Sequence, residues 1–209
     1  MIIAQPDTET LLAVVLGAGL ATVGGFSERH FERIMQRREK ERSAALLFGE
    51  LLSAMRVMMR LAKDSHGRGD PYGPITLRFI RAVQREVEIY NRNRETLLDL
   101  REAAIRASVS VLIARLSFSL DGIIDATAEL TAMEAGLAEG AASDPERCRE
   151  NIATLKETRD AAFTFAVETG ADITPLLARL APLAQHNFGA TESALPADIL
   201  ANPAPEQAQ

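Results

Sequence analysis

The feature that most constrains the fold of this sequence is an uninterrupted apolar segment near its amino terminus, Leu11–Phe26. Uncharged residues extend from Thr10 to Ser27, and at about 1.5 Å per residue they make a helix of roughly 27 Å. This length just reaches across a hydrocarbon core of about 30 Å. The segment therefore predicts a single transmembrane helix that stands nearly upright.

The charges on either side of this segment predict its orientation. Asp7 and Glu9 precede it without any Lys or Arg. Six basic residues follow it: Arg29, Arg33, Arg37, Arg38, Lys40 and Arg42. Basic flanks stay on the cytoplasmic side, so we expect a single-pass protein of a bacterial inner membrane, with the N-terminus outside. The six cations are then expected to face membrane lipid.

Three other interpretations of the segment remain open. A cleavable signal peptide needs a basic start, but residues 1–10 are acidic. A buried core helix is compatible with a segment near the lower length limit for a span. The run Val14–Thr22 also resembles the glycine-rich turn of a dinucleotide-binding fold. That fold needs a second strand ending in an acidic residue about twenty positions later, where this chain has the charged run Arg38–Arg42.

Small residues recur every fourth position in the apolar segment, which places them on one side of a helix: Ala13, Gly17, Ala21 and Gly25. Such a stripe lets two helix backbones approach closely in a membrane. It predicts a helix-dimer contact, although glycine and alanine are also common in spans that pack against nothing.

The composition of the chain predicts an all-α fold. The sequence has 209 residues with 47% hydrophobic and only 5% aromatic residues, and alanine, leucine, arginine and glutamate favour helices. The single cysteine, Cys148, excludes an internal disulfide. Residues 27–106 carry 17 basic and 12 acidic side chains, whereas residues 107–209 carry 6 and 15. The basic half beside the span suits an anionic inner leaflet.

The pattern divides the chain into an outer tail (1–9), a transmembrane helix (10–27), a cytoplasmic antiparallel bundle of long helices (28–184) and a disordered tail (185–209). We expect the first helix to run on to about Lys63 and a loop at Asp64–Pro74. The second soluble helix is expected from Ile75 to a break at Asn91–Arg94, and the third over Leu97–Leu137 with a bend at Gly122. A fourth helix is expected from an N-cap at Ser143 to a C′ residue at Gly170, and a last one over Thr174–Leu183.

Several local patterns have a structural and a functional interpretation. Met55, Met58 and Met59 are expected in the core, with an adaptable partner groove as the alternative. An arginine row on the second soluble helix is expected to be a solvated face, and phosphate binding is the alternative; its members are Arg78, Arg81, Arg85 and Arg92. The triplet Arg68–Asp70, read by cell-adhesion receptors, is expected to be a chance occurrence.

The segment Val87–Ala107 resembles a group of uncharacterised bacterial proteins that have one N-terminal span and a cytoplasmic helical domain. The likeness rests on a Tyr-x-x-Asn segment that leads to Leu97-Leu98 and a further long helix. The resemblance implies a membrane-tethered helical protein and carries no catalytic residues.

The sequence contains no pattern that predicts catalysis, a cofactor or a metal. His30, His66 and His186 lie in separate contexts, and none belongs to a Glu-x-x-His motif. We therefore expect a membrane-anchored, non-catalytic interaction or scaffold protein that forms homo-oligomers and binds an unknown protein partner, without nucleic acid. The alternatives are an anionic-lipid or, less favoured, a nucleic-acid binding module that uses the basic half, and an enzyme with an unrecognised site.

Overall fold

The computed structural model describes the backbone of residues 8–140 and 144–189, and the side chains of residues 31–140 and 144–189. Within these ranges all regular structure is helical and no strand occurs, which confirms the predicted all-α class. The elements are α1 (Thr8–Gly67), α2 (Pro74–Arg92), the short 3-10 helix η1 (Arg94–Asp99), α3 (Ala103–Ala138), α4 (Pro145–Ala171) and α5 (Ile173–Ala184).

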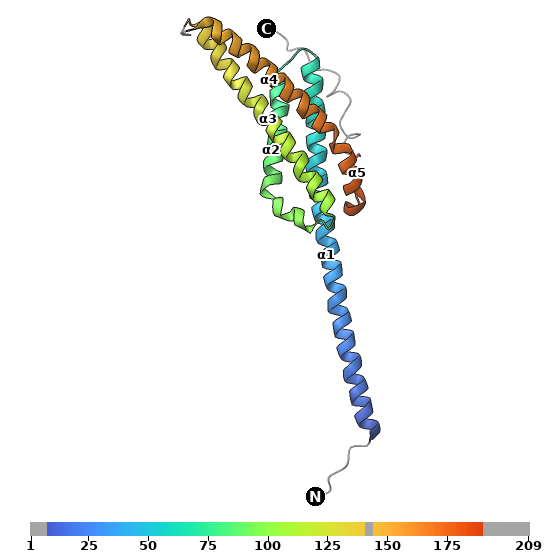
Figure 1. The fold of residues 1–209 in the computed structure, drawn as a ribbon. Helices are drawn as coiled ribbons and strands as arrows, with labels where there is room; N and C mark the ends of the chain where they lie inside the picture. Colours follow the sequence, from blue (N-terminus) through green and yellow to red (C-terminus); the bar gives the residue numbers. More distant parts are fainter. Residues whose placement is uncertain (1–7, 141–143, 190–209) are drawn as a thin grey trace, which may run out of the picture.

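Helix α1 has two parts with different surroundings. Its C-terminal part packs inside the helical body, beginning at the buried pair Ala44 and Ala45. Its N-terminal part extends alone from that body (Figure 1). The body therefore begins about sixteen residues after position 28, where the sequence pattern placed it. The apolar segment Leu11–Phe26 belongs to the solitary part, and its side chains lie outside the described residues.

The core is built around the C-terminal part of α1, against which α2, α4 and α5 pack. Fully buried side chains come from every α-helix of the body: Phe48, Leu52 and Met55 of α1, Ile80 and Val83 of α2, Leu116, Leu120 and Ile123 of α3, Ala166 of α4, and Ile173 and Leu180 of α5. Met55 and Met59 are buried and Met58 packs partly buried against the same core, so the methionines fill the core as predicted.

The connection from α2 to α3 differs from the expected continuous helix at Leu97–Leu137. Leu97 and Leu100 turn inward and are buried, and α3 begins only at Ala103. The Arg106 guanidinium donates hydrogen bonds to the carbonyls of Leu100 and Arg101. Burial of the two leucines and these bonds stabilise a bend that helical periodicity does not reveal.

The loop between α1 and α2 is organised by Asp70. Its carboxylate accepts hydrogen bonds from the backbone N–H groups of Ile75 and Thr76 at 3.1 and 2.9 Å, and from the Ser65 hydroxyl at 3.3 Å. An Asp that satisfies free N–H groups at a helix start is a helix cap. The acidic residue of the Arg68–Asp70 triplet therefore has a structural role within the loop.

Helices α3 and α4 pack along each other and extend together beyond the rest of the body (Figure 1). Asp144 caps α4 by accepting a hydrogen bond from the backbone N–H of Arg147 at 3.2 Å; the expected cap, Ser143, lies outside the described residues. Gly170 was expected to end α4 as a C′ residue, and this prediction is wrong. It lies inside the helix, where a Cβ would come within 3.5 Å of the Met59 Cβ, so it marks a close helix contact.

The chain after α5 returns to α1. Phe188 is buried against the core, and the Ser53 hydroxyl donates a hydrogen bond to its carbonyl at 3.4 Å. The tail predicted from residue 185 therefore begins with a packed segment, Gln185–Gly189. Residues 190–209 lie outside the described part of the chain.

One helix with described side chains, α3, is long and apolar enough to cross a membrane by length and composition. Core helices of soluble proteins meet the same criterion, and α3 buries Ile105, Leu116 and Ile123 among the other helices. The expected membrane helix at residues 10–27 is different from this one. Its helical backbone is part of α1, while its side chains are not described.

Candidate functional site

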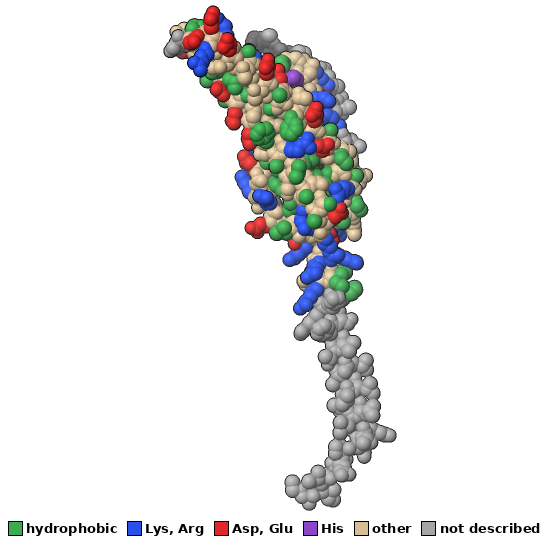
Figure 2. Space-filling view, viewed as in Figure 1, with side chains coloured by type: hydrophobic (Ala, Val, Ile, Leu, Met, Phe, Trp, Pro, Cys, Tyr) green, Lys and Arg blue, Asp and Glu red, His purple; other side chains and the backbone are tan. Residues whose placement is uncertain are grey.

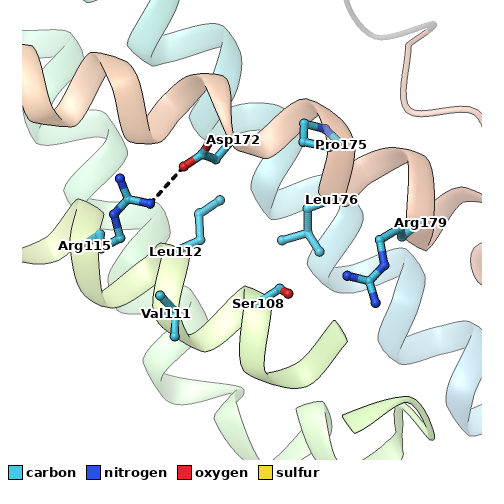
Figure 3. Close-up of a pocket in the computed structure, with 8 residues that line it drawn as sticks. All are labelled: Ser108, Val111, Leu112, Arg115, Asp172, Pro175, Leu176 and Arg179. Carbon is cyan, nitrogen blue, oxygen red and sulfur yellow. Dashed lines mark hydrogen bonds and ion pairs between the residues drawn. The ribbon is translucent and has the colours of Figure 1, made fainter. Parts of the chain in front are cut away.

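A hollow on the helical body lies between α3 and α5 and is shown in Figure 3. Its volume is 310 Å³. Leu112 and Leu176, which are buried, face each other across it, and Val111 and Pro175 line its outer part. The hollow lies between α3 and α5, with the two leucines at its inner part and Val111 and Pro175 at its outer part.

Two ion pairs border this hollow. Arg115 Nη1 lies 2.9 Å from Asp172 Oδ2, and the Arg115 guanidinium also lies over the Phe165 ring, 4.9 Å from its centroid. At the other end, Arg179 pairs with Glu102. Exposed ion pairs contribute only about 0–1 kcal/mol to stability. One pair joins α3 to the residue before α5, and the other joins α5 to the residue before α3.

The residues that line this hollow can pack against an apolar group, but they offer no activated nucleophile or base. The remaining polar group among its eight lining residues is the Ser108 hydroxyl, which donates to the Ala104 carbonyl at 2.8 Å. A nucleophile or general base needs an activating partner within hydrogen-bond reach, and these residues supply only paired ions. The hollow is suited to accept an apolar side chain between two charged borders.

Exposed apolar side chains continue from the hollow along α3. Val111 is 58% exposed and Phe118 is 78% exposed. Seven residues are about two helical turns, so both lie on one side of α3. Exposed alanines at the intervening helical positions complete a small-to-large apolar stripe, which we call the α3 outer face: Ala104, Ala107, Val111, Ala114 and Phe118. Figure 2 shows hydrophobic side chains interspersed with charged ones on the visible face of the body.

A second charged feature is the neck, which we define as residues 31–43 between the solitary part of α1 and the body. Its basic side chains are exposed: Arg33, Arg37, Arg38, Lys40 and Arg42. Figure 2 shows Lys and Arg gathered there. The Glu41 side chain is only 14% exposed and accepts a hydrogen bond from the Arg101 backbone N–H at 3.1 Å, so the end of the neck contacts the body. The side chain of the sixth predicted cation, Arg29, lies outside the described residues.

The small-residue stripe predicted in the apolar segment cannot be placed from side chains. Ala13, Gly17, Ala21 and Gly25 have a helical backbone within α1, and their side chains lie outside the described residues. The arginine row of α2 is exposed as predicted, and Arg92 lies 3.7 Å from Glu88 in an ion pair one turn apart.

Aromatic side chains pack together where α1, the loop and α4 meet. The His66 ring stacks on Phe163 at 4.3 Å between centroids and meets the edge of Tyr72 at 4.9 Å. The Arg159 guanidinium lies over the Tyr72 ring at 3.6 Å. Burial raises the pKa of the Tyr72 phenol well above its ordinary value, and the Asp160 carboxylate raises it further. His66 falls within the loop expected at Asp64–Pro74, but it is half-buried in the last turn of α1.

Within the described ranges, no group of three His, Cys, Asp or Glu side chains has a metal-binding arrangement. Cys148 is a half-exposed residue of α4. The surface features that sequence reasoning missed are the α3 outer face and the Arg115–Asp172 ion pair. The α3 outer face could have been found from the spacing of its apolar residues, which alternates between three and four positions. The more strongly apolar inner side of α3 obscured this pattern.

Comparison of the chain with protein-family models, with curated proteins and with solved structures finds no significant match.

Proposed function

We propose that this chain is a membrane-anchored, non-catalytic interaction protein. Residues 10–27 of α1 form its transmembrane helix and the N-terminus lies outside. The chain that follows, up to residue 184, lies in the cytoplasm as the basic neck and an antiparallel helical body. One observation carries the proposal: α1 is a continuous helix from Thr8 to Gly67, and among its described side chains, from residue 31 onward, the first buried one is Ala44. The helix thus carries the apolar segment clear of the core that would otherwise cover it (Figure 1).

The energetics favour a lipid environment for this solitary part. Removing one Val or Leu side chain from water is worth about 1.5–3 kcal/mol, and the sequence places Leu11, Leu12 and Leu16 among similar residues there. A hydrocarbon core also requires every backbone group to be satisfied within the segment, which a helix achieves. An unbroken helix that begins at Thr8 supplies such a backbone.

The charges of the neck support the cytoplasmic position of the body and contact with anionic lipid. A cation near an anionic leaflet gains about 1 kcal/mol, and this gain decays over a Debye length of about 8 Å. At about 1.5 Å per residue, Arg33 lies roughly 9 Å beyond Ser27 and Arg42 roughly 22 Å. Arg29 and Arg33 therefore gain most from the anionic lipid. The cations farther along the neck keep it solvated.

Self-association is the interaction that we propose for this protein. The small-residue stripe supports close packing of two spans, and the α3 outer face supplies an exposed apolar surface on the body. A basic lipid- or nucleic-acid-binding module remains the second candidate. The neck favours lipid over nucleic acid, because its cations follow a membrane-length apolar segment along one helix.

The decisive experiment uses the single cysteine as a reporter of topology. A membrane-impermeant maleimide should label Cys148 only after cells are permeabilised, because α4 is cytoplasmic in this proposal. In a Cys148→Ser background, Ile3→Cys should be labelled in intact cells. The chain should also stay with membranes after alkaline carbonate washing. Release by carbonate, or labelling of Cys148 in intact cells, would overturn the anchor or its orientation.

A further inference from the structure

A groove on the face where α1 meets α4 and α5 is separate from the α3 outer face. Two neighbouring hollows, of 430 and 170 Å³, are both lined by Arg56 and Thr174, and together we call them the α1/α5 groove. Met59, Val167 and Gly170 give its larger hollow an apolar lining. Basic side chains from three positions of α1 border it: Arg56, Arg60 and Lys63.

The described chain ends at the mouth of this groove. Phe188 and Gly189 line its smaller hollow. Phe188 is held there because its ring occupies the space that Gly49 leaves on α1, and the His186 ring nitrogen lies 3.1 Å from a Glu50 carboxylate oxygen. The starting point of residues 190–209 is therefore fixed beside the groove.

The sequence that follows matches the groove in charge and apolarity. Residues 190–209 contain three acidic residues, Glu192, Asp198 and Glu206, and no Lys or Arg. Three large apolar residues lie among them: Leu195, Ile199 and Leu200. The groove has the opposite character, with three basic side chains above an apolar lining.

The length of this segment is sufficient to occupy the groove. Arg56 and Lys63 are two helical turns apart, which is about 10 Å. A chain spans up to about 3.3 Å per residue when extended, so the eleven residues from Gly189 to Leu200 reach about 36 Å. The segment can therefore pass the basic border and place its apolar residues over Met59 and Val167 without strain.

We propose that the α1/α5 groove binds the C-terminal segment of the same chain, residues 191–200, with Leu195, Ile199 and Leu200 in its apolar part and Glu192 and Asp198 at its basic border. A short tether gives this segment an effective concentration of about millimolar at the groove, which favours it over a second copy. The proposal is independent of the membrane anchor, because the groove lies wholly on the body.

Zero-length carbodiimide crosslinking of the full chain tests this proposal, because the chain has only three lysines, Lys40, Lys63 and Lys156. We expect amide formation between Lys63 and Glu192 or Asp198, at a yield several-fold above that of Lys40 or Lys156 to the same carboxylates. Peptide mass spectrometry identifies the products. Mixing isotope-labelled with unlabelled chains separates crosslinks within one chain from those between chains.

Two tail variants distinguish docking from a chance encounter of charges. Leu195→Ser with Ile199→Ser keeps every charge and should lower the Lys63 crosslink several-fold, because the apolar contact is lost. Ala208→Ser is the matched control and should leave the yield unchanged. A Lys63 yield equal to that of Lys156, crosslinks only between differently labelled chains, or a yield insensitive to the two serines would each overturn the proposal.

Discussion

Gly49 and Phe188 determine how the end of the described chain meets α1. A Cβ built on Gly49 would lie 2.0 Å from Phe188 Cζ, closer than any van der Waals contact allows. Phe188 is almost fully buried, and its carbonyl accepts a hydrogen bond from Ser53. A glycine inside a helix ordinarily costs about 1 kcal/mol relative to alanine. Here that cost is offset by the burial of an aromatic ring.

Gly49→Ala is therefore expected to destabilise the body, by up to about 2 kcal/mol. Overpacking or displacement of the Phe188 ring costs about 1–3 kcal/mol, and the better helix propensity of alanine returns about 1 kcal/mol. Thermal unfolding of the detergent-solubilised chain measures the difference.

Two further variants isolate the cause. In a Phe188→Ala background the sign should reverse, with Gly49→Ala stabilising by about 1 kcal/mol, because only helix propensity remains. Gly136→Ala in α3, where a Cβ meets nothing within 4 Å, should stabilise in the natural background. If Gly49→Ala destabilised equally with and without Phe188, the ring would not be the reason for the glycine.

Tyr72 predicts a specific loss of stability at alkaline pH. Burial and then the Asp160 carboxylate raise the pKa of its phenol in the folded state. A raised pKa means that folding favours the neutral phenol. This contribution is fully present below the ordinary pKa of about 10 and decreases as the pH rises above it.

Tyr72→Phe should therefore lose less stability than the natural chain between pH 10 and pH 11. Denaturant unfolding at several pH values measures both slopes, and Tyr90, present in both proteins, cancels in the comparison. Equal slopes would show that the Tyr72 phenol ionises as easily in the folded state as in the unfolded state.

At the scale of the element, α3 is apolar on two sides. Its inner side contributes Ile105, Leu116 and Ile123 to the core, and its outer side exposes Val111 and Phe118. This explains why α3 has the length and apolarity of a membrane span although it lies in the middle of the helical body. The apolar residues of α3 that the core does not bury lie on its exposed outer side.

Phe118→Ser should weaken self-association of the full chain several-fold while changing its stability by less than about 1 kcal/mol, since surface substitutions rarely cost more. Cysteine crosslinking at Val111 in a Cys148→Ser background measures association in membranes. Ile75→Ser, on an exposed site of α2, is the matched control. Unchanged crosslinking in Phe118→Ser would remove the α3 outer face as a self-association surface.

The whole molecule is a helical body at one end of a single long helix. If residues 10–27 span a membrane as we propose, distance along α1 decides which charges meet that membrane. Arg33 and Arg42 have the same chemistry and similar exposure, but lie about 9 and 22 Å beyond Ser27 in an upright helix.

Arg33→Gln should lower the enrichment of anionic lipid around the reconstituted chain several-fold, and Arg42→Gln should leave it unchanged, because Arg42 lies more than two Debye lengths away. Energy transfer from a dye at Gln36→Cys to labelled phosphatidylserine, with Cys148 replaced by serine, measures the enrichment. Equal effects of the two substitutions would mean that the neck lies along the lipid surface.

The helical elements were predictable wherever local signals act alone. The start of α2 after Gly73, the start of α4 after its capping residue and the burial of the α1 methionines follow from proline, capping and periodicity. The bend before α3 was not predictable, because it depends on burial of Leu97 and Leu100 against other helices. Of the candidate functional features, only the basic neck was predictable, because its charges follow one another on one helix and need no tertiary partner. The hollow between α3 and α5 was not.

The sequence alone determined that this chain is helical and that an apolar segment and a basic neck follow one another on its first helix, because both depend on residues close in the chain. The tertiary structure alone decided where the body begins, why Gly170 lies within a helix contact, how Phe188 returns to Gly49 and which side of α3 remains exposed. Each of these depends on contact between residues far apart in the chain, and local periodicity contains no information about the partner.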